Sequence, residues 1–246
     1  MINLSAIPSQ SLLGRVLRGI LKALPSQAKV PIVQGRLRGN WWIVGSGQHG
    51  FWLGSFDYDK QRLFEQLLKP GDVVYDIGAH VGFYTLLASK LVGPEGKVYA
   101  FEPLPRNLRY LREHLRLNHV TNVEVVEAAV SDVSEEVAFD QSSYHTWGHL
   151  DPNGTLRVRA LKLDQAVLDL GFRPPKLVKV NVEGAEKAVL QGAREMIQLH
   201  HPIFIVSTHG DTIHRECCAL LKEQGYELRS VYGPGSTENP AVLAMI

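Results

Sequence analysis

The sequence of 246 residues has only two cysteines, Cys217 and Cys218, and they are adjacent. Adjacent cysteines rarely pair with each other, and without a Cys-x-x-Cys motif the chain offers neither a zinc ribbon nor a dithiol redox site. We interpret both as small apolar residues of a helix. The histidines have no spacing typical of metal ligands, so no metal site is expected.

An excess of charge of either sign is also missing. The 26 lysines and arginines nearly balance the 25 aspartates and glutamates, which gives a formal net charge of +1. Because nucleic-acid-binding domains are usually distinctly basic, this balance argues against a nucleic-acid partner. Hydrophobic residues make up 45% of the chain, a fraction too high for intrinsic disorder at such a low net charge.

Long apolar runs are absent, and none approaches the roughly 20 residues that span a bilayer. Residues 2–24 carry Arg15, Arg18 and Lys22 within their apolar part, which argues against an export signal, so a cytoplasmic protein is expected. Apolar residues at a spacing of three to four predict a helix over residues 11–24. We expect this helix to pack over the domain, and the alternative is a weak contact with a membrane surface or a partner. The oligomeric state is left open.

From residue 72 onward, apolar strands alternate with helical segments. The last two predicted strands, 227–231 and 241–245, have no helix between them and predict a terminal antiparallel hairpin. The alternation indicates βαβ units and a parallel sheet covered on both faces, since its strands are apolar throughout. The sequence therefore predicts an α/β, doubly wound, Rossmann-like fold with a mostly parallel, seven-stranded sheet. The other predicted strands are 73–77, 98–101, 123–129, 177–182 and 203–207.

The first 69 residues are expected to form an N-terminal appendage of a helix and short strands, ahead of a main domain over residues 70–246. Short strands are predicted at 36–44 and 50–54, in a stretch rich in tryptophan and phenylalanine. An irregular polar loop is predicted at 141–155, inside the main domain. As the least regular parts, both stretches are expected to shape the substrate site.

The feature that carries chemistry follows the strand 73–77, where Asp76 precedes a loop containing Gly78 and Gly82. Glycines let the backbone approach a ligand closely, and the helix that follows aims its first N–H groups at that ligand. Asp76 would repel a pyrophosphate and attract an ammonium group, which favours a cofactor with an amino-acid part over NAD. Glu102 ends the next strand, where a carboxylate can accept hydrogen bonds from both hydroxyls of a ribose.

These residues resemble a known family. The segments 76–85 and 101–103 resemble the first two motifs of class I S-adenosylmethionine-dependent methyltransferases. More narrowly, residues 178–186 (VKVNVEGAE) resemble the signature of the FkbM family of O-methyltransferases, and residues 53–57 resemble the segment ahead of its core. The resemblance implies the class I methyltransferase fold and S-adenosyl-L-methionine as cofactor.

The matching positions imply how the cofactor is held. The resemblance places the ribose on Glu102, with Pro103 shaping the adjoining turn, and the adenine near Ala129. It also places Asn181 in the cofactor site, facing the methyl group. The methionine part is implied to lie against five residues of the glycine loop: Asp76, Gly78, Ala79, His80 and Gly82.

Two positions depart from the family's usual residues. Asn181 stands where aspartate is usual, which weakens any case for a divalent ion, because Mg²⁺ prefers charged oxygen ligands. Ser207 stands where glutamate is common, so that glutamate is missing as a base. The first candidate for a general base is therefore His209, and the second is Glu183, as the base or as the group that orients one.

The resulting hypothesis is an S-adenosylmethionine-dependent O-methyltransferase. The resemblance implies a small-molecule or saccharide acceptor, methylated on a hydroxyl of a sugar, glycan or natural product. Three alternatives stay open: an N-methyltransferase on the same fold, a nucleotide-dependent oxidoreductase, and a cofactor-binding protein without turnover. Asn181 and Ser207 motivate the last of these, and the fold by itself does not decide among them.

Overall fold

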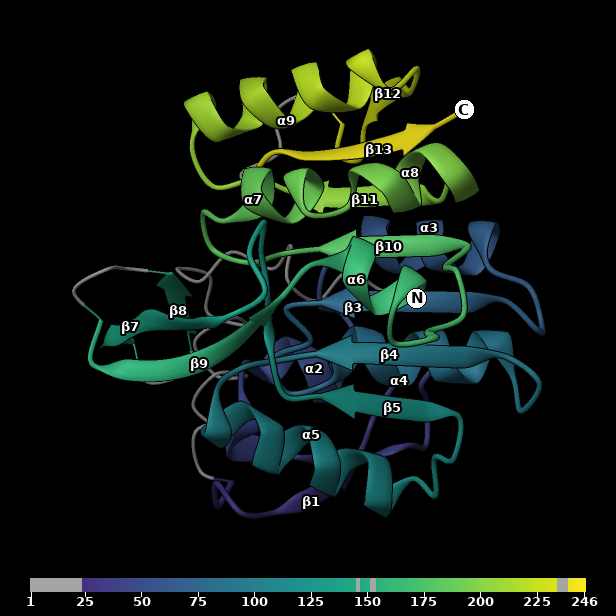
Figure 1. The fold of residues 1–246 in the computed structure, drawn as a ribbon. Coiled ribbons are helices and arrows are strands. Elements are labelled where there is room, and N and C mark those ends of the chain that lie inside the picture. Colours follow the sequence, from purple (N-terminus) through teal and green to yellow (C-terminus); the bar gives the residue numbers. More distant parts are fainter. Residues whose placement is uncertain (1–23, 145–146, 151–153, 234–238) are drawn as a thin grey trace.

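The computed structural model describes residues 24–144, 147–150, 154–233 and 239–246. Its centre is a seven-stranded sheet in which β13 alone runs antiparallel to its neighbours β11 and β12 (Figure 1). The predicted doubly wound α/β fold and its terminal antiparallel hairpin are confirmed. In sheet order the strands are β12 (Glu227–Ser230), β13 (Ala241–Met245), β11 (Ile203–Ser207), β10 (Leu177–Val180), β3 (Val73–Ile77), β4 (Lys97–Phe101) and β5 (Val123–Val126).

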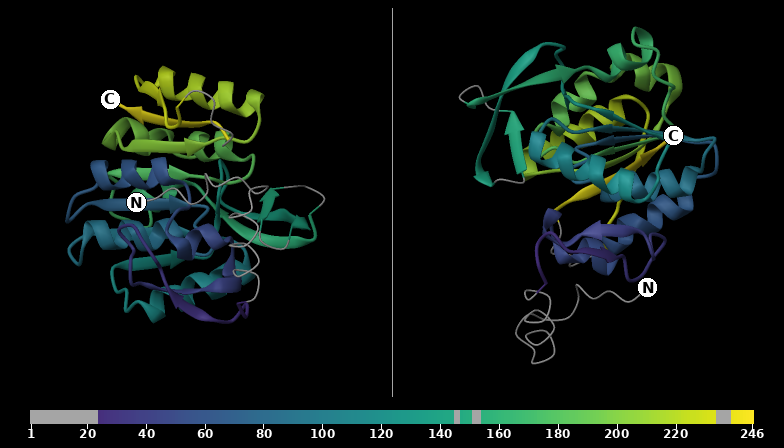
Figure 2. Two further views of the ribbon diagram at one scale, coloured as in Figure 1. Left: turned by 180° about the vertical axis from the view of Figure 1, so that it is seen from behind. Right: turned by 90° about the horizontal axis from the view of Figure 1, so that it is seen from below.

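Helices cover both faces of this sheet (Figures 1 and 2). None of the helices in the described ranges has both the length and the apolar character that crossing a bilayer requires. One face carries α3 (Tyr58–Leu67), α4 (Phe83–Val92) and α5 (Pro105–Leu117). The other face carries α6 (Leu163–Leu168), α7 (Glu186–Gln191), α8 (Arg194–His200) and α9 (Asp211–Glu223).

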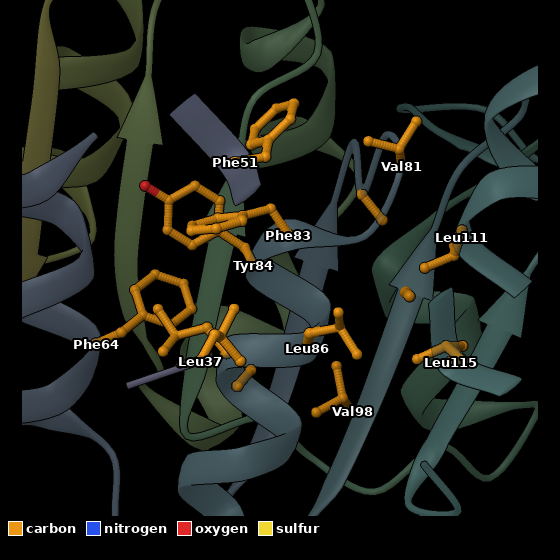
Figure 3. Packing of buried hydrophobic residues seen from close by; sticks show 14 of the residues in the cluster. Leu37, Phe51, Phe64, Val81, Phe83, Tyr84, Leu86, Val98, Leu111 and Leu115 are labelled. Atoms are coloured by element: carbon orange, nitrogen blue, oxygen red, sulfur yellow. The ribbon is translucent and has the colours of Figure 1, made fainter. Parts of the chain in front are cut away.

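The core is divided by the sheet into two apolar clusters because successive side chains of a strand point to opposite faces. In β3, Val74 belongs to the cluster under α4, whereas Tyr75 and Ile77 belong to the cluster under α7 and α8. Figure 3 shows part of the first cluster, where the rings of Phe64 and Tyr84 lie 5.0 Å apart. Strands buried on both faces explain why the sequence has continuous apolar runs instead of an alternating pattern.

The N-terminal stretch differs in part from its prediction. An antiparallel pair of short strands, β1 (Lys29–Pro31) and β2 (Trp41–Ile43), leads into η2 (Val44–Ser46). The strand predicted at 50–54 is wrong, because α2 (His49–Leu53) forms there and Gly54 ends it at φ +71°. The helix predicted over residues 11–24 and its membrane or partner contact lie outside the described residues, apart from Leu24.

Packing joins this stretch to the sheet. Trp42 is fully buried, and its ring stacks on that of His114 at 3.8 Å. Trp42 also shares one apolar cluster with Val74 and Leu86 of the main sheet. The division of the chain at residue 70 stays a prediction.

A second sheet extends beyond the carboxyl ends of the parallel strands (Figures 1 and 2). Its strands are, in order, β6 (Ala129–Val130), β9 (Leu156–Leu161), β7 (Glu136–Tyr144) and β8 (Trp147–Leu150). The irregular loop predicted at 141–155 is therefore wrong in part, because β7 continues to Tyr144 and pairs with β8. Antiparallel backbone pairing needs no apolar repeat, so the polar residues of β7 and β8 gave no sequence pattern from which this hairpin could be predicted.

Candidate active site

A cavity of about 900 Å³ lies where the parallel strands end, a volume within the usual range of small-molecule sites. Residues that follow β4, β3, β10 and β11 contribute to its wall in that spatial order, since these strands are neighbours in the sheet. Further parts of the wall come from the stretch before α3 and from Tyr232, after β12. Ligands of doubly wound folds bind at this edge.

The glycine loop after β3 packs tightly between two strands. The N–H groups of Gly78 and Ala79 donate to the carbonyl of Phe101, at 3.0 and 2.9 Å. Gly78 has φ +73°, and a Cβ there would lie 2.0 Å from the carbonyl oxygen of Asn181. Only glycine fits such a position, so the motif is a requirement of the backbone as well as a feature of the cavity wall.

Asp76 lies behind this wall and is completely buried. Its Oδ2 accepts a hydrogen bond from Thr85 Oγ1 at 2.6 Å, and its Oδ1 forms an ion pair with Lys179 Nζ at 2.9 Å. Lys179 lines the cavity and donates to the Gly78 carbonyl at 2.7 Å. Asp76 therefore supports the cavity wall from behind, through Thr85 and Lys179. The direct contact with the ammonium group of a cofactor, which the sequence leads us to expect, stays a prediction.

Glu102 follows the end of β4, where the sequence places it, and lines the cavity. It accepts hydrogen bonds from the backbone N–H groups of His80 and Leu104, at 2.8 and 2.9 Å, and from Asn107 Nδ2 at 3.2 Å. Burial raises the pKa of Glu102, although these hydrogen bonds and the charge of Lys179 oppose the rise. The neighbouring wall is formed by Pro103, Ala128, Ala129 and Val130.

On the other side of β3, the candidate bases lie together. The His209 ring contacts Glu183 Oε2 through Nε2 at 3.2 Å and Glu186 Oε1 through Nδ1 at 2.8 Å. Burial alone would lower the pKa of His209, but the hydrogen bond to Glu186 and the charges of both carboxylates outweigh it, so the pKa is raised. Burial would raise the pKa of Glu186, but the contacts with His209 and hydrogen bonds from backbone N–H groups outweigh it, so the pKa is lowered. Asn181 lines the same wall.

Sequence reasoning missed a polar cluster around Lys60. This side chain of α3 is almost fully buried and donates to Asp57 Oδ2 at 2.5 Å and to Ser207 Oγ at 2.9 Å. The Tyr232 hydroxyl donates to the other oxygen of Asp57 at 3.0 Å. Nothing in the local pattern of α3 distinguishes Lys60 from a solvent-facing lysine, since its partner Ser207 lies 147 positions away.

Backbone strain is concentrated at the cavity. Within the described ranges, positive φ angles occur at five residues other than glycine, and three of them line the cavity. These are Asp57 (φ +47°), His80 (φ +54°) and Glu183 (φ +53°). Such conformations cost about 1–3 kcal/mol each and are enriched at functional sites, where the surroundings enforce them.

Comparisons with known proteins give the context of this site. Residues 76–228 match the family model described as "Methyltransferase FkbM domain". Hexuronic acid methyltransferase AglP of Haloferax volcanii is 26% identical over 169 residues, which cover 68% of either chain. The 31-O-demethyl-FK506 methyltransferase FkbM of Streptomyces tacrolimicus is 25% identical over 202 residues, covering 68% of this chain and 77% of its own.

A solved structure supports the fold. The crystal structure of methyltransferase FkbM from Methylobacillus flagellatus superimposes with a TM-score of 0.55 at 17% identity. The match covers 75% of this chain and 50% of that chain, so this protein spans half the length of that structure. At this identity the likeness concerns the fold alone.

Proposed function

The chain belongs to the FkbM methyltransferase family and is a class I, S-adenosyl-L-methionine-dependent methyltransferase, and from this premise we propose that it methylates a hydroxyl of a sugar, glycan or natural product. Two relatives support this acceptor class by their names, one for hexuronic acid and one for an O-demethylated FK506. The proposed partner is therefore a small-molecule or saccharide acceptor.

The order of the strands along the carboxyl edge supports a placement of the cofactor. We place the ribose at Glu102 and the adenine against Ala129 and its neighbours, on the β4 side of the cavity. The methionine part then follows the loop from Gly78 to Gly82, toward Asn181 on the β10 side. The size of the cavity and a buried carboxylate beside a small apolar wall fit this cofactor.

The same order separates binding from chemistry. When bound, S-adenosyl-L-methionine supplies a methyl group on a positively charged sulfur. The end of β10 and the segment after β11 then present Glu183 and His209 on the acceptor side. Asn181 is a neutral amide at this position, so it orients through hydrogen bonds without adding charge.

The observation that carries the proposal is an acid–base pair in the cavity that also contains Glu102 and the glycine loop. A hydroxyl must lose its proton as its oxygen gains the methyl group, so a base beside it is useful. A neutral amine attacks with a lone pair that is already available, and a binding protein without turnover needs no base. The pair therefore favours an O-methyltransferase over an N-methyltransferase and over a binding protein without turnover.

Calorimetric titration with S-adenosyl-L-methionine, S-adenosylhomocysteine and NAD tests the placement. We expect saturable binding of the two sulfur ligands and none of NAD. Glu102→Gln should weaken that binding about 10- to 100-fold, because hydrogen bonds to a charged group contribute roughly 1.5–3 kcal/mol. Glu113→Gln, the same change at a partly exposed position of α5 that does not line the cavity, is the control. Equal affinities of the two variants would refute the ribose position.

The acceptor class needs a separate assay. Purified protein is incubated with labelled cofactor and with hexuronic acids, hexose glycosides or matched amino sugars, and the products are analysed by mass spectrometry. We expect label on oxygen. Transfer to the amino sugars alone would instead establish the N-methyltransferase, and binding without transfer to any acceptor would contradict turnover on these acceptors.

A further inference from the structure

We propose that Glu186 is a positioning residue that holds His209 protonated on both ring nitrogens, and that Glu183 is consequently the group that accepts the proton of the acceptor hydroxyl. This inference rests on the proposed O-methyltransferase function and assigns the roles within its acid–base group. It reverses the order of the two candidates taken from the sequence, where His209 comes first.

The contacts of the imidazole carry the first step. Both ring nitrogens of His209 face carboxylate oxygens, Glu186 at 2.8 Å and Glu183 at 3.2 Å. A neutral imidazole has one N–H and one lone pair, whereas an ionised carboxylate only accepts hydrogen bonds. In a neutral ring, the nitrogen without a proton would point its lone pair at a carboxylate oxygen, so the hydrogen bond to Glu186 and the ion pair with Glu183 are both favourable only when the ring is protonated on both nitrogens. In that state His209 has no lone pair for a proton from the substrate.

The burial of Glu186 carries the second step. Its side chain is completely buried, and its Oε2 has no hydrogen-bond partner among the described residues. A carboxylate in such a position needs a nearby cation, because an unpaired buried charge costs several kcal/mol. His209 supplies this charge, because its Nδ1 lies 2.8 Å from Oε1 of Glu186. Lys60 on α3 is the cation that opposes protonation of His209, and the two carboxylates outweigh it.

Glu186 also shapes the turn that presents Glu183. Its Oε1 accepts the backbone N–H groups of Val182 and Gly184, both at 3.2 Å, on either side of Glu183. Glu183 has φ +53° between these two anchors, and its side chain lines the cavity with 27% exposure. One buried carboxylate thus fixes both the ring of His209 and the backbone of Glu183.

The proton balance follows from this arrangement. As the acceptor oxygen forms its bond to the methyl carbon and the carbon–sulfur bond breaks, the hydroxyl proton moves to the Glu183 carboxylate. From there it passes to solvent, to which Glu183 is partly exposed. His209 stays protonated throughout and orients Glu183 through Nε2. Turnover then requires an ionised Glu183 and a protonated His209.

An NMR titration of the histidine rings in the full chain without ligands tests the proposal. His209→Gln identifies the His209 signal. We expect its midpoint above 6.5, the ordinary value for histidine, and a decrease of about 1 pH unit or more in Glu186→Gln, because an opposite charge at this distance shifts a pKa by 1–3 units. Glu216→Gln on α9 removes a charge that does not contact His209, and it should leave the midpoint unchanged.

A second variant keeps the test decisive where Glu186→Gln does not fold. Glu183→Gln changes a partly exposed side chain and should also lower the His209 midpoint. A wild-type midpoint at or below 6.5, or one that neither variant moves, would overturn the proposal. Calorimetry with S-adenosyl-L-methionine on the same proteins separates the proposed function from the assigned residue roles. A wild type that does not bind the cofactor would refute the function, whereas the NMR titration would still report the pKa of His209.

Turnover on an acceptor that the labelling assay identifies then distinguishes Glu183 from His209 as the base. Glu183→Gln should lower kcat by at least about 100-fold, the lower end of general-base effects. The wild-type kcat should fall as pH rises through the His209 midpoint, and Glu186→Gln should move that fall to lower pH. A kcat that rises through the same midpoint would make neutral His209 the base and overturn the assignment.

Discussion

Neutralising Asp76 should destabilise the protein far more than an exposed charge change does. Asp76 and Lys179 form an ion pair at 2.9 Å with side-chain exposures of 0% and 5%. In Asp76→Asn the volume is kept, but the buried ammonium of Lys179 loses the carboxylate with which it forms this ion pair. Breaking a buried pair from one side costs about 3–5 kcal/mol, out of a total stability of about 5–15 kcal/mol.

Thermal unfolding followed by circular dichroism measures this loss. At about 2–4 °C per kcal/mol for a chain of this size, Asp76→Asn should lower Tm by roughly 6–20 °C. Lys179→Met should also destabilise, because it leaves the Asp76 carboxylate buried with Thr85. The double variant removes both charges, so it should lose less than the sum of the single variants, with a coupling of roughly 1–3 kcal/mol.

A second double-mutant cycle provides the control. Lys97 and Glu124 form an ion pair of nearly the same length, 3.0 Å, at exposures of 28% and 46%. The cycle of Lys97→Met and Glu124→Gln should give a coupling below about 1 kcal/mol, as expected for solvent-screened charges. Equal couplings in the two cycles, or additive effects at Asp76 and Lys179, would refute the argument from burial.

Two further predictions concern the loop after β3 and its surroundings. Burial lowers the pKa of His114 to about 4, against the opposing hydrogen bond to the Val81 carbonyl. Between pH 4 and 6.5 the unfolded chain therefore binds more protons than the folded protein, so the free energy of unfolding rises with pH over that window. In urea titrations, His114→Gln should remove about 3 kcal/mol of this pH dependence. Gly78→Ala should lower the free energy of unfolding by more than about 3 kcal/mol, since its Cβ would meet a backbone oxygen. Gly71→Ala, at φ +89° with open space around it, should lower it by about 1 kcal/mol. Equal losses of stability in the two variants would contradict the close approach at Gly78.

The sequence predicted the parts of the fold that depend on local pattern. The strand expected at 73–77 coincides with β3, and the glycine loop after it lies at the cavity. Both follow from rules that act within about ten residues, namely continuous apolar runs for buried strands and glycine where the backbone turns. The strand predicted at 50–54 was wrong because so short a stretch of glycine, aromatic and leucine residues does not distinguish a strand from a turn of helix.

The site was predictable only as far as its residues follow strand ends. Glu102, Glu183 and His209 lie within three residues of the end of a strand, so the topology alone brings them to one edge. Lys60 and Glu186 contact Ser207 and His209, which lie in other parts of the chain, and no local sequence pattern predicts such contacts. Glu186 even stands within a recognised motif, yet its meaning depends on the position of His209, 23 residues later.

Three carboxylates connect these observations, because Glu102, Glu186 and Asp57 each secure a strained residue of the cavity. Glu102 accepts the N–H of His80, and Glu186 accepts the N–H groups on both sides of Glu183. Asp57, itself at positive φ, is fixed by the donors that its own carboxylate binds. Strained conformations persist only where surroundings enforce them. The charges that shape this cavity are therefore also the charges that hold its backbone, and a variant that neutralises one should change site geometry and stability together.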